Sequence, residues 1–368
     1  MDLALAHYPL CMRGGGEMVV LQIARRFNPV IYTTNYSREA LPEFKEFDVR
    51  VLNPRVQAIF PHAKPGEPTT AVSHLGYLYS KIKDDYDVLN ANGTPTQWLA
   101  MRNPRVSWYC HAPFISYDPK FRKKYEGAAI SNSLWGGFSH SLDKAAAKKI
   151  STVCTNSEFA KARVERFIGR KDARVLHPGI DPKEFTCEDY SRHFLYLTRI
   201  TPQKRVECAI DAFRLFGRRG WKLKIVGTPM QGQEKYLSWL KDRAMGCDVE
   251  FVLSASPADI KRAYALCYAA LFCGADEAWG LVPLEAMASC KPVIAMNEGG
   301  PRESILHGKT GFLVNSVEEM AEKMRYLADH PGVCEQMGKA GRKHVARNYT
   351  RKAFLDGLGR VFKQTAKM

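Results

Sequence analysis

Short runs rich in β-branched and aromatic residues alternate with stretches of helical periodicity along the whole chain. The runs lie at 2–7, 29–34, 49–52, 87–91, 105–111, 151–156 and 173–178, and then at 193–198, 221–227, 248–253, 269–274, 292–296 and 311–314. Between them, apolar residues recur every three or four positions, as at Val206, Ala209, Ile210 and Phe213 in a helix expected over 202–216. This alternation is typical of parallel sheets whose strands are joined by crossover helices.

Breakers near the middle of the chain divide the pattern in two. The segment HPGIDPKEF at 177–185 places Pro-Gly and Asp-Pro directly after a strand, so we expect an interdomain linker at about 179–192. A chain of 368 residues also exceeds the usual size of one domain. We therefore predict an α/β protein with two doubly wound, Rossmann-like domains. Its ligand sites are expected at the carboxyl ends of the strands, in a cleft where the domains face each other.

Composition narrows the class of protein. With 45% hydrophobic and 25% charged residues, the chain is typical of a soluble globular protein. It has no apolar stretch near the roughly 20 residues that cross a bilayer, and its first residues lack the pattern of a signal peptide, so we expect the protein in the cytoplasm. The ten cysteines lie far apart without a C-x-x-C pair, which predicts reduced thiols rather than disulfides or zinc ligands.

The charge balance favours an anionic partner. The chain has 54 Lys and Arg against 38 Asp and Glu, a formal net charge of +16. The densest basic runs are Lys120, Arg122, Lys123 and Lys124, then Lys144, Lys148 and Lys149, and then the stretch 161–174. A nucleic acid, an anionic membrane surface and a phosphorylated substrate all fit this excess, as does charge that serves solubility alone. No aromatic-and-basic recognition motif supports nucleic acid, so we expect no such partner.

Two patterns carry only weak chemical signals. RGGGE at 13–17 follows a strand and opens a helix, where Gly14, Gly15 and Gly16 would allow an anion to approach the backbone. The segment lacks G-x-G-x-x-G, and a tight strand-to-helix turn explains it as well as a phosphate site does. DDYD at 84–87 looks like a metal-binding D-x-D motif, but it directly precedes an apolar strand, which favours a solvated helix end.

Cations and carboxylates at strand ends in the second half are more specific. Arg199 and Lys204 lie five residues apart across a Pro-containing turn, an arrangement suited to a diphosphate. Glu277 follows the strand at 269–274, and Glu285 lies eight residues later in a helix that Pro283 helps to start. Carboxylates placed in this way can accept hydrogen bonds from sugar hydroxyls. A Gly-Gly turn at 299–300, after the next strand, again suits a phosphate or a ribose.

These motifs together resemble the retaining glycosyltransferases of family 4, which have the two-Rossmann GT-B architecture. The core of the resemblance is EAWGLVPLEAMA at 277–288, the family's two Glu residues with seven residues between them. Supporting segments are GGGE at 14–17, CHAPF at 110–114, TNSEF at 155–159, HPGID at 177–181, TRITPQKR at 198–205, GGPRES at 299–304 and GKTGFLV at 308–314. The resemblance implies an acceptor domain at 1–180, a nucleotide-sugar domain at 181–347, and a C-terminal helix within 348–368 that crosses back to the first domain.

The resemblance also implies roles for the matching residues. Arg199 and Lys204 would hold the donor diphosphate, and Glu277 and His111 the donor sugar, and these four form the expected catalytic set. Glu285 would bind the nucleotide ribose. The nucleotide site is expected to be completed by Gly15, Gly16, Leu281 and Val282, and the sugar site by Ala278, Trp279 and Gly280. Trp279 is bulkier than the Phe frequent in the family, and Ser289-Cys290 replaces the commoner Ala/Cys-Gly pair.

A subgroup is indicated by HAPFISYD at 111–118, which is similar to a stretch of mannosyltransferases that build polysaccharide or lipid-linked glycans. We therefore favour GDP-mannose as the donor, with a UDP-sugar as the alternative. The acceptor is expected to be a lipid-linked glycan or an oligosaccharide, reached by peripheral docking on the anionic inner face of the cell membrane. The acceptor or membrane side would be formed by Tyr117, Asp118, Lys120, Arg122, Lys123 and Lys124.

The expected reaction retains the configuration of the anomeric carbon. Arg199 and Lys204 would stabilise the charge that grows on the leaving phosphate, so neither a cofactor nor a divalent metal is expected to be required. A nucleotide-sugar epimerase and a non-catalytic sugar-nucleotide-binding protein remain alternatives. A nicotinamide oxidoreductase is disfavoured, because the glycine fingerprint is missing and no acidic residue follows the second strand.

Overall fold

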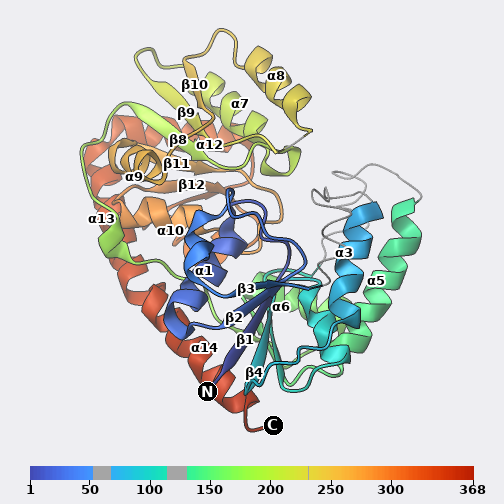
Figure 1. The fold of residues 1–368 in the computed structure, drawn as a ribbon. Helices are drawn as coiled ribbons and strands as arrows, with labels where there is room; N and C mark the ends of the chain where they lie inside the picture. Colours follow the sequence, from blue (N-terminus) through green and yellow to red (C-terminus); the bar gives the residue numbers. More distant parts are fainter. Residues whose placement is uncertain (53–67, 114–130, 231) are drawn as a thin grey trace. The chain divides into compact units, whose positions relative to one another are not determined.

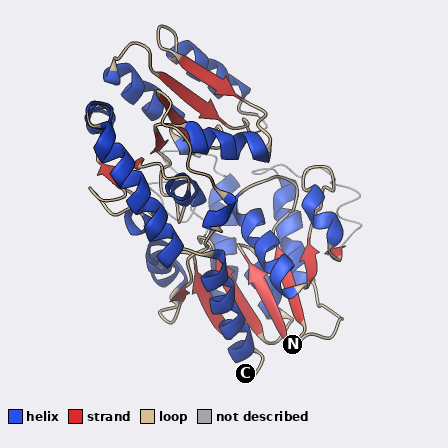
Figure 2. Ribbon diagram, turned by 90° about the vertical axis from the view of Figure 1, so that its left-hand side faces the viewer, coloured by secondary structure: helices blue, strands red, loops and turns tan. Residues whose placement is uncertain are grey.

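The computed structural model describes residues 1–52, 68–113, 131–230 and 232–368, which form two compact units (Figure 1). Unit 1 comprises Met1–His177 and Ala353–Met368, and unit 2 comprises Pro178–Lys352. In each unit, the strands of a parallel sheet lie between helices (Figure 2). All thirteen strands expected from the sequence are present. None of the helices in the described ranges is long and apolar enough to span a membrane.

The sheet of unit 1 has seven parallel strands in the order β3-β2-β1-β4-β5-β6-β7. The chain winds to one side of β1 and then, from β4, to the other side. In such sheets, ligands bind at the carboxyl ends of the two strands where the order reverses. The strands are β1 (Leu3–His7), β2 (Val30–Thr33), β3 (Val49–Val51), β4 (Val88–Asn92), β5 (Val106–Cys110), β6 (Thr152–Thr155) and β7 (Arg174–Val175).

Helices bury both faces of this sheet. Leu3 and Leu5 belong to one apolar cluster, together with residues of α1 and α14. Ala4 and Ala6 belong to the other cluster, together with residues of α3 and α5. Side chains of a strand therefore alternate between two dry layers, as expected for a parallel sheet. The helices are α1 (Gly15–Phe27), α3 (Pro68–Tyr79), α5 (Ser131–Ala147), α6 (Glu158–Arg163) and α14 (Arg351–Thr365), with shorter turns η1 (Pro42–Glu46), η2 (Thr96–Met101) and η4 (Val164–Ile168).

Unit 2 repeats the design with six parallel strands in the order β10-β9-β8-β11-β12-β13. Its strands are β8 (His193–Leu197), β9 (Lys222–Val226), β10 (Val249–Val252), β11 (Ala269–Phe272), β12 (Val293–Met296) and β13 (Gly311–Val314). Its helices are α7 (Val206–Phe216), α8 (Glu234–Arg243), α9 (Pro257–Leu266), α10 (Leu281–Ala288), α11 (Pro301–Ser304), α12 (Val317–Asp329) and α13 (Pro331–Asn348), with turns η5 (Pro182–Glu184) and η6 (Pro202–Lys204).

The helix expected over 202–216 is interrupted near its start. The 3-10 turn η6 ends at Lys204, and α7 begins only at Val206. Between them, Arg205 adopts the left-handed conformation with φ 49°. An apolar pattern predicts which face of a helix is buried, but it carries no information about such a break.

The chain passes between the units twice, and the two connecting segments are hydrogen-bonded to each other. The Ile180 amide donates to the Tyr349 carbonyl at 3.0 Å, and the Arg351 amide donates to the Ile180 carbonyl at 2.9 Å. A Cβ atom on Gly179 would lie only 2.4 Å from the carbonyl carbon of Thr350. Glycine is therefore required at position 179 for this close pairing of backbones.

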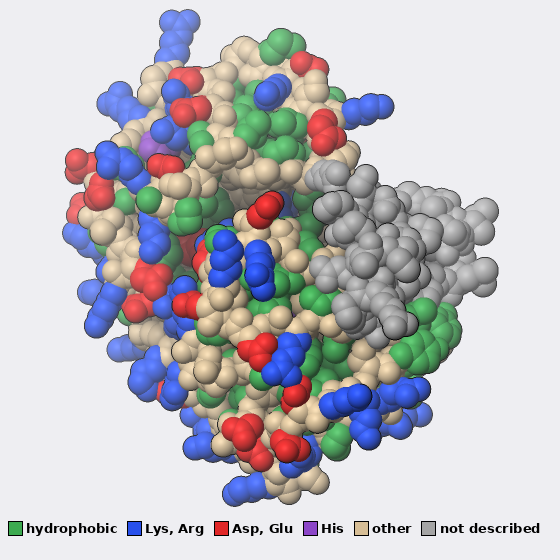
Figure 3. All heavy atoms as spheres, viewed as in Figure 1, with side chains coloured by type: hydrophobic (Ala, Val, Ile, Leu, Met, Phe, Trp, Pro, Cys, Tyr) green, Lys and Arg blue, Asp and Glu red, His purple; other side chains and the backbone are tan. Residues whose placement is uncertain are grey.

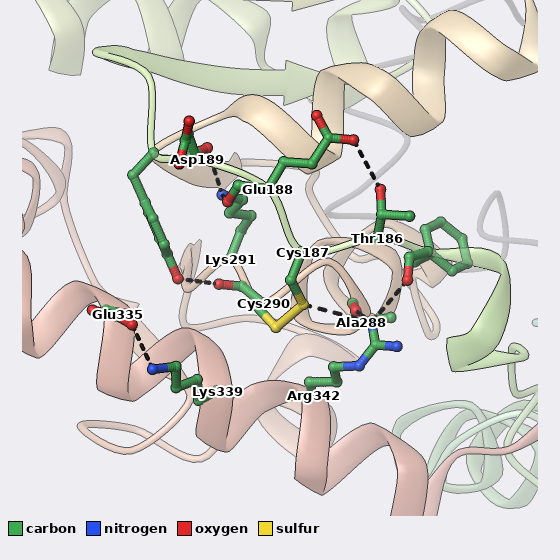
Figure 4. Close-up of a disulfide and its surroundings, with 12 residues drawn as sticks. Thr186, Cys187, Glu188, Asp189, Ala288, Cys290, Lys291, Glu335, Lys339 and Arg342 are labelled. Atoms are coloured by element: carbon green, nitrogen blue, oxygen red, sulfur yellow. Dashed lines mark hydrogen bonds and ion pairs between the residues drawn. A yellow bond between two sulfur atoms is a disulfide. The ribbon is translucent and has the colours of Figure 1, made fainter.

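The prediction that all ten cysteines are reduced is wrong for one pair. Cys187, which follows η5, forms a disulfide with Cys290 at the end of α10 (Figure 4). Two further contacts attach the same segment to the loop after α10: Lys291 Nζ donates to the Asp189 carbonyl at 2.9 Å, and Tyr190 Oη donates to the Cys290 carbonyl at 2.6 Å. The half-cystines are 103 positions apart in sequence, so only the packing of the linker against α10 brings them together.

We expect the protein, denatured without reductant, to present eight free thiols, and ten after reduction. Reduction should lower the free energy of unfolding by about 2–4 kcal/mol, because the cross-link restricts a long loop of the unfolded chain. Thiol titration and denaturant unfolding with and without reductant measure both effects. The variant with Cys187→Ser and Cys290→Ser should match the reduced wild type. Ten reactive thiols before reduction would contradict the assignment.

Candidate functional site

Three neighbouring strands of unit 2 lead into the loops that carry both predicted cations and the first predicted carboxylate. Arg199 and Lys204 follow β8, Glu277 follows β11, and the glycine pair at 299–300 follows β12. Because β8, β11 and β12 are adjacent in the sheet, their carboxyl ends bring these loops together. These residues therefore lie at the carboxyl ends of the central strands, which is where ligands bind in sheets of this kind.

Lys204 and Glu277 form an ion pair between Nζ and Oε2. Their side chains are only 15% and 25% exposed, so solvent screens the pair weakly. Burial by itself would raise the pKa of Glu277, but the ammonium of Lys204 and the guanidinium of Arg199 bring that pKa below its ordinary value. Glu277 is therefore a carboxylate at neutral pH, within a set of two cations and one anion that retains net positive charge.

The glycine pair after β12 is explained by the packing of the neighbouring loop. A Cβ atom on Gly299, which has φ 59°, would lie 2.2 Å from the Glu277 carbonyl oxygen. A Cβ on Gly300 would lie 2.4 Å from the Cα of Trp279, and the Gly300 amide donates to the Glu277 carbonyl at 2.8 Å. The two glycines thus allow the loop after β12 to hold the backbone of Glu277 in place, a role that the sequence did not indicate.

Glu285 lies within α10 and is held by a residue that no sequence motif indicated. Tyr264 of α9 donates its hydroxyl to Glu285 Oε2 at 2.7 Å. Burial raises the pKa of Glu285, although the hydrogen bond from Tyr264 and the charge of Lys261 oppose the rise. Tyr264 is fully buried and follows the apolar pattern of its helix, so in the sequence it is indistinguishable from an ordinary core residue.

The side chain of Trp279 is part of the core of unit 2. It is 3% exposed, its Nε1 donates to the Pro178 carbonyl at 2.9 Å, and its ring meets that of Tyr349 edge-on. The expected sugar contact can therefore come only from the backbone of this residue. The neighbouring predicted residues are half-buried: Ala278 and Gly280 in the loop, and Leu281 and Val282 at the start of α10. The large indole of Trp279 thus packs against and hydrogen-bonds the segment at Pro178, where the chain enters unit 2.

In unit 1, the predicted His111 belongs to a polar cluster at the ends of three adjacent strands. His111 follows β5, Asn92 ends β4 and His7 ends β1. His111 Nε2 lies 2.8 Å from Asn92 Oδ1, and His7 Nδ1 lies 3.0 Å from the Asn92 carbonyl. Burial lowers the pKa of His111 to about 4. Burial and then the charge of His111 lower the pKa of His7 to about 3, so both imidazoles are neutral at pH 7.

The glycine loop lies beside this cluster, at the start of α1. A Cβ atom on Gly16 would lie 2.0 Å from Tyr8 Oη and 3.6 Å from His7 Cε1, so Gly16 makes room for these side chains. A Cβ on Gly15 would meet nothing within 4 Å, which leaves its backbone open to a ligand. Among the described residues, no side chain caps the helix at Gly14. Backbone amides at the start of a helix favour an anion.

Other residues singled out in the sequence do not belong to the clusters described above. Tyr117, Asp118, Lys120, Arg122, Lys123 and Lys124 fall outside the described residues. In the DDYD segment, Asp84 accepts a hydrogen bond from Tyr32 and pairs with Arg50 at 2.7 Å. Asp87, the second aspartate of the D-x-D pattern, accepts a hydrogen bond from the Asp2 amide at 2.8 Å, so both residues are engaged in surface contacts. Across the described ranges, no cluster of three or more His, Cys, Asp or Glu could hold a metal ion. On the face shown in Figure 3, Lys and Arg side chains are interspersed with Asp and Glu.

Comparison with known proteins gives consistent matches. The model described as Glycosyltransferase Family 4 matches residues 13–184, and the model described as Glycosyl transferases group 1 matches residues 180–344. The chain is 26% identical over 392 aligned positions to alpha-1,3/1,6-mannosyltransferase ALG2 of Homo sapiens, covering 94% of this chain and 92% of that protein. ALG2 of Dictyostelium discoideum is 25% identical over 305 positions, 71% of each chain.

Solved structures share the fold at low sequence identity. Anabaena HepE in complex with UDP has a TM-score of 0.77 and 18% identity, covering 99% of this chain and 100% of that chain. Sucrose-phosphate synthase from Thermosynechococcus elongatus has a TM-score of 0.75 and 18% identity, covering 99% and 98%. The predicted pair of doubly wound α/β domains is confirmed by these similarities together with the two parallel sheets.

The histidine cluster predicts a stability that falls in mild acid. The unfolded histidines titrate near the ordinary value of 6.5, but His7 and His111 do so only at about 3 and about 4 in the folded protein. As the pH falls below 6.5 the unfolded state binds protons that the folded state does not, so the free energy of unfolding decreases. Denaturant unfolding at pH 7, 6 and 5 measures the slope.

His111→Asn should reduce this slope by up to about 1.4 kcal/mol per pH unit, the effect of one proton. Asn315→Ala, at an exposed position in unit 2, changes no titratable group and is the matched control, so its slope should equal that of the wild type. Equal slopes for wild type and His111→Asn would show that burial does not suppress protonation of this cluster.

Proposed function

We propose that this chain, which belongs to the glycosyltransferases of group 1 and family 4 and has their GT-B architecture, transfers a mannosyl group from a nucleotide sugar to a glycan acceptor. Membership and enzyme class rest on the two family models, which together match residues 13–344, and they confirm the resemblance found in the sequence. The mannosyl group is supported by the ALG2 mannosyltransferases, of which the human protein aligns with 94% of this chain.

The observation that carries the proposal is the set formed by Arg199, Lys204 and Glu277 at the ends of β8 and β11. A donor diphosphate fits beside the two cations, and the Glu277 carboxylate, kept ionised by Lys204, can accept hydrogen bonds from sugar hydroxyls. Glu285, positioned by Tyr264, is proposed to bind the ribose. In unit 1, the neutral His111 and the open backbone at Gly15 are proposed as further contacts to the donor.

The proposed chemistry follows from this charge distribution. As the bond to the leaving phosphate breaks, positive charge grows at the anomeric carbon and negative charge grows on the phosphate. Arg199 and Lys204 stabilise the latter more strongly in the transition state than in the ground state. We propose that the departing phosphate oxygen takes the proton of the acceptor hydroxyl on the same face, with retention of configuration. Fixed cations at the leaving group make a divalent metal unnecessary in this scheme.

We propose GDP-mannose as the donor, and a UDP-sugar is the second candidate. The mannosyl relatives favour the first. The second is favoured by the fold neighbour Anabaena HepE, which has been solved in complex with UDP and with UDP-glucose. A nucleotide-binding assay separates the two, because the base is the part of the donor that differs most.

A panel of GDP, GDP-mannose, UDP, UDP-glucose and ADP tests the donor by thermal shift. A ligand at 100 times its dissociation constant stabilises the folded state by about 2.7 kcal/mol, so the correct base should raise the melting temperature selectively. Lys204→Ala should abolish the shift and lower mannosyl transfer at least about 100-fold. Transfer is expected to persist in EDTA.

The control for this panel is Lys222→Ala. Lys222 also forms an ion pair in unit 2, with Glu250 at 3.4 Å, but it starts β9 and therefore lies at the amino edge of the sheet. The control should bind and turn over like the wild type. A UDP response would overturn the mannosyl donor and keep the transferase. Normal turnover in Lys204→Ala would refute the site, and loss of activity in EDTA restored by Mn²⁺ would refute the metal-free scheme.

We also propose a lipid-linked or oligosaccharide acceptor and peripheral docking on an anionic, cytoplasmic membrane face. The support is the net charge of +16 and the basic run at 120–124, which follows His111 in the chain. A second basic run includes Lys148 and Lys149. Since α5 ends at Ala147 and β6 begins at Thr152, these two residues lie at the amino edge of the sheet of unit 1.

Charge reversal separates the two runs. Each Lys or Arg near an anionic surface contributes on the order of 1 kcal/mol, so changing Lys120, Arg122, Lys123 and Lys124 to Glu should abolish sedimentation with anionic vesicles. The control changes Lys144, Lys148 and Lys149 to Glu and should still sediment. A wild type that stays in the supernatant at low salt would refute membrane docking, and equal losses in both variants would show an unspecific charge effect.

A further inference from the structure

A second charged pair lies beside Lys204, and the proposed reaction does not use it. Arg205 donates from Nη1 to Glu298 Oε1 and from Nη2 to Glu298 Oε2, each at 3.0 Å. It also donates from Nε to the Cys273 carbonyl at 2.6 Å. The Arg205 side chain is only 11% exposed. Three donors in one plane are a property of the guanidinium group, and lysine could not reproduce the arrangement.

This one side chain connects the loops of three adjacent strands. Arg205 ends the loop after β8, Cys273 begins the loop after β11, and Glu298 lies in the loop after β12. The first of these loops carries Lys204 and the second carries Glu277. The positions of both partners in the ion pair therefore depend on how these loops are held against one another.

Backbone hydrogen bonds run between the same loops. The Ala275 amide donates to the Gln203 carbonyl at 2.9 Å, and the Gly300 amide donates to the Glu277 carbonyl at 2.8 Å. These two bonds connect the loops in pairs, whereas Arg205 connects all three. Their amides are also natural reporters of any loosening, because exchange with solvent requires the bond to open.

The backbone of Arg205 suggests that its side chain is needed at this position. The residue has φ 49° and ψ 50°, a left-handed conformation that is less favourable for a residue with a Cβ atom than for glycine. Residues held in such conformations cluster at functional sites, where the surrounding contacts compensate for the strain. Here the contacts with Glu298 and Cys273 supply that compensation.

We propose that Arg205 is a positioning residue, which acts through Glu298 and the Cys273 carbonyl to fix Lys204 and Glu277 in the geometry that the donor requires. The inference rests on the proposed function for the role of Lys204 and Glu277. A displacement of about 1 Å at a reacting centre can lower the rate about 100-fold, so loss of this connection should appear mainly in turnover.

Arg205→Gly removes the side chain and accepts the left-handed backbone without strain. We expect kcat to fall about 10- to 100-fold, with a smaller change in the KM for the donor and a melting temperature close to that of the wild type. Arg105→Gly is the matched control. Arg105 also has a positive φ of 51° and donates to a backbone carbonyl, that of Tyr86 at 2.7 Å, but it precedes β5 at the amino edge of unit 1. Its turnover should stay within about twofold of the wild type.

Further variants test whether Arg205 acts through Glu298. Glu298→Ala should reproduce most of the loss, and the double variant should be no slower than Arg205→Gly, because residues that act as one unit are not additive. Arg205→Lys should rescue little, since an ammonium cannot bind both carboxylate oxygens and the carbonyl together. If Glu298→Ala turned over normally while Arg205→Gly did not, Arg205 would not act through Glu298 and the positioning role as proposed would be wrong.

Hydrogen exchange provides a readout that needs no donor. Exchange of the Ala275 and Gly300 amides should become faster in Arg205→Gly and stay unchanged in Arg105→Gly. Hydrogen exchange distinguishes failure of the proposed function from failure of the positioning role. A wild type that transfers no sugar from any nucleotide would refute the proposed function. Unchanged exchange in Arg205→Gly would refute the connection between the loops. Normal kcat in Arg205→Gly, in an active wild-type background, would also overturn the inference.

Discussion

Burial of both faces of each sheet is the constraint on which the rest of this structure depends. In unit 2, for example, every residue of β11 and β12 is buried, so the strands offer no position for a solvated polar group. Helices cover both faces, and the backbone groups are paired along the ladders. In these central strands polar chemistry is therefore confined to the strand ends, and the loops at the carboxyl edge are where the candidate site residues gather in both units.

The same constraint explains why the site charges occur in pairs. Lys204 and Glu277 emerge just beyond buried strands and are largely shielded from solvent. A shielded charge without a partner would be costly, because the loss of hydration is not compensated. Pairing removes most of this cost, and Arg199, which is exposed, adds positive charge where hydration is available. The result is a preorganised cationic site that does not depend on an unpaired buried charge.

Features that are local in the sequence could be predicted, and contacts between distant segments could not. The strands follow from short apolar runs, and the Glu277 and Glu285 pair follows from one contiguous motif. By contrast, Arg205 and Glu298 are 93 positions apart, and Cys187 and Cys290 are 103 apart. Nothing in either segment alone marks these pairs, since the packing of separate loops or helices creates them.

Side-chain direction was the other property that the sequence did not contain. Trp279 stands in the most specific motif of the chain, yet its indole points into the core toward Pro178. Tyr264 follows a core pattern, yet its hydroxyl reaches Glu285. A motif predicts that a loop is close to the ligand, but the rotamer and the neighbouring segment decide whether the side chain or only the backbone can make contact.

The Lys204–Glu277 pair has a consequence for how a donor would be bound. A diphosphate placed beside Lys204 adds negative charge next to Glu277, so the ammonium would be shared between carboxylate and phosphate. The attraction between Lys204 and Glu277 would weaken, and the carboxylate oxygens of Glu277 would then be available to the sugar hydroxyls. Binding of the diphosphate would thus prepare the sugar contact. During this exchange of partners, Lys204 and Glu277 must keep their positions although the charge around them changes. A rigid connection of the three loops through Arg205 provides this property.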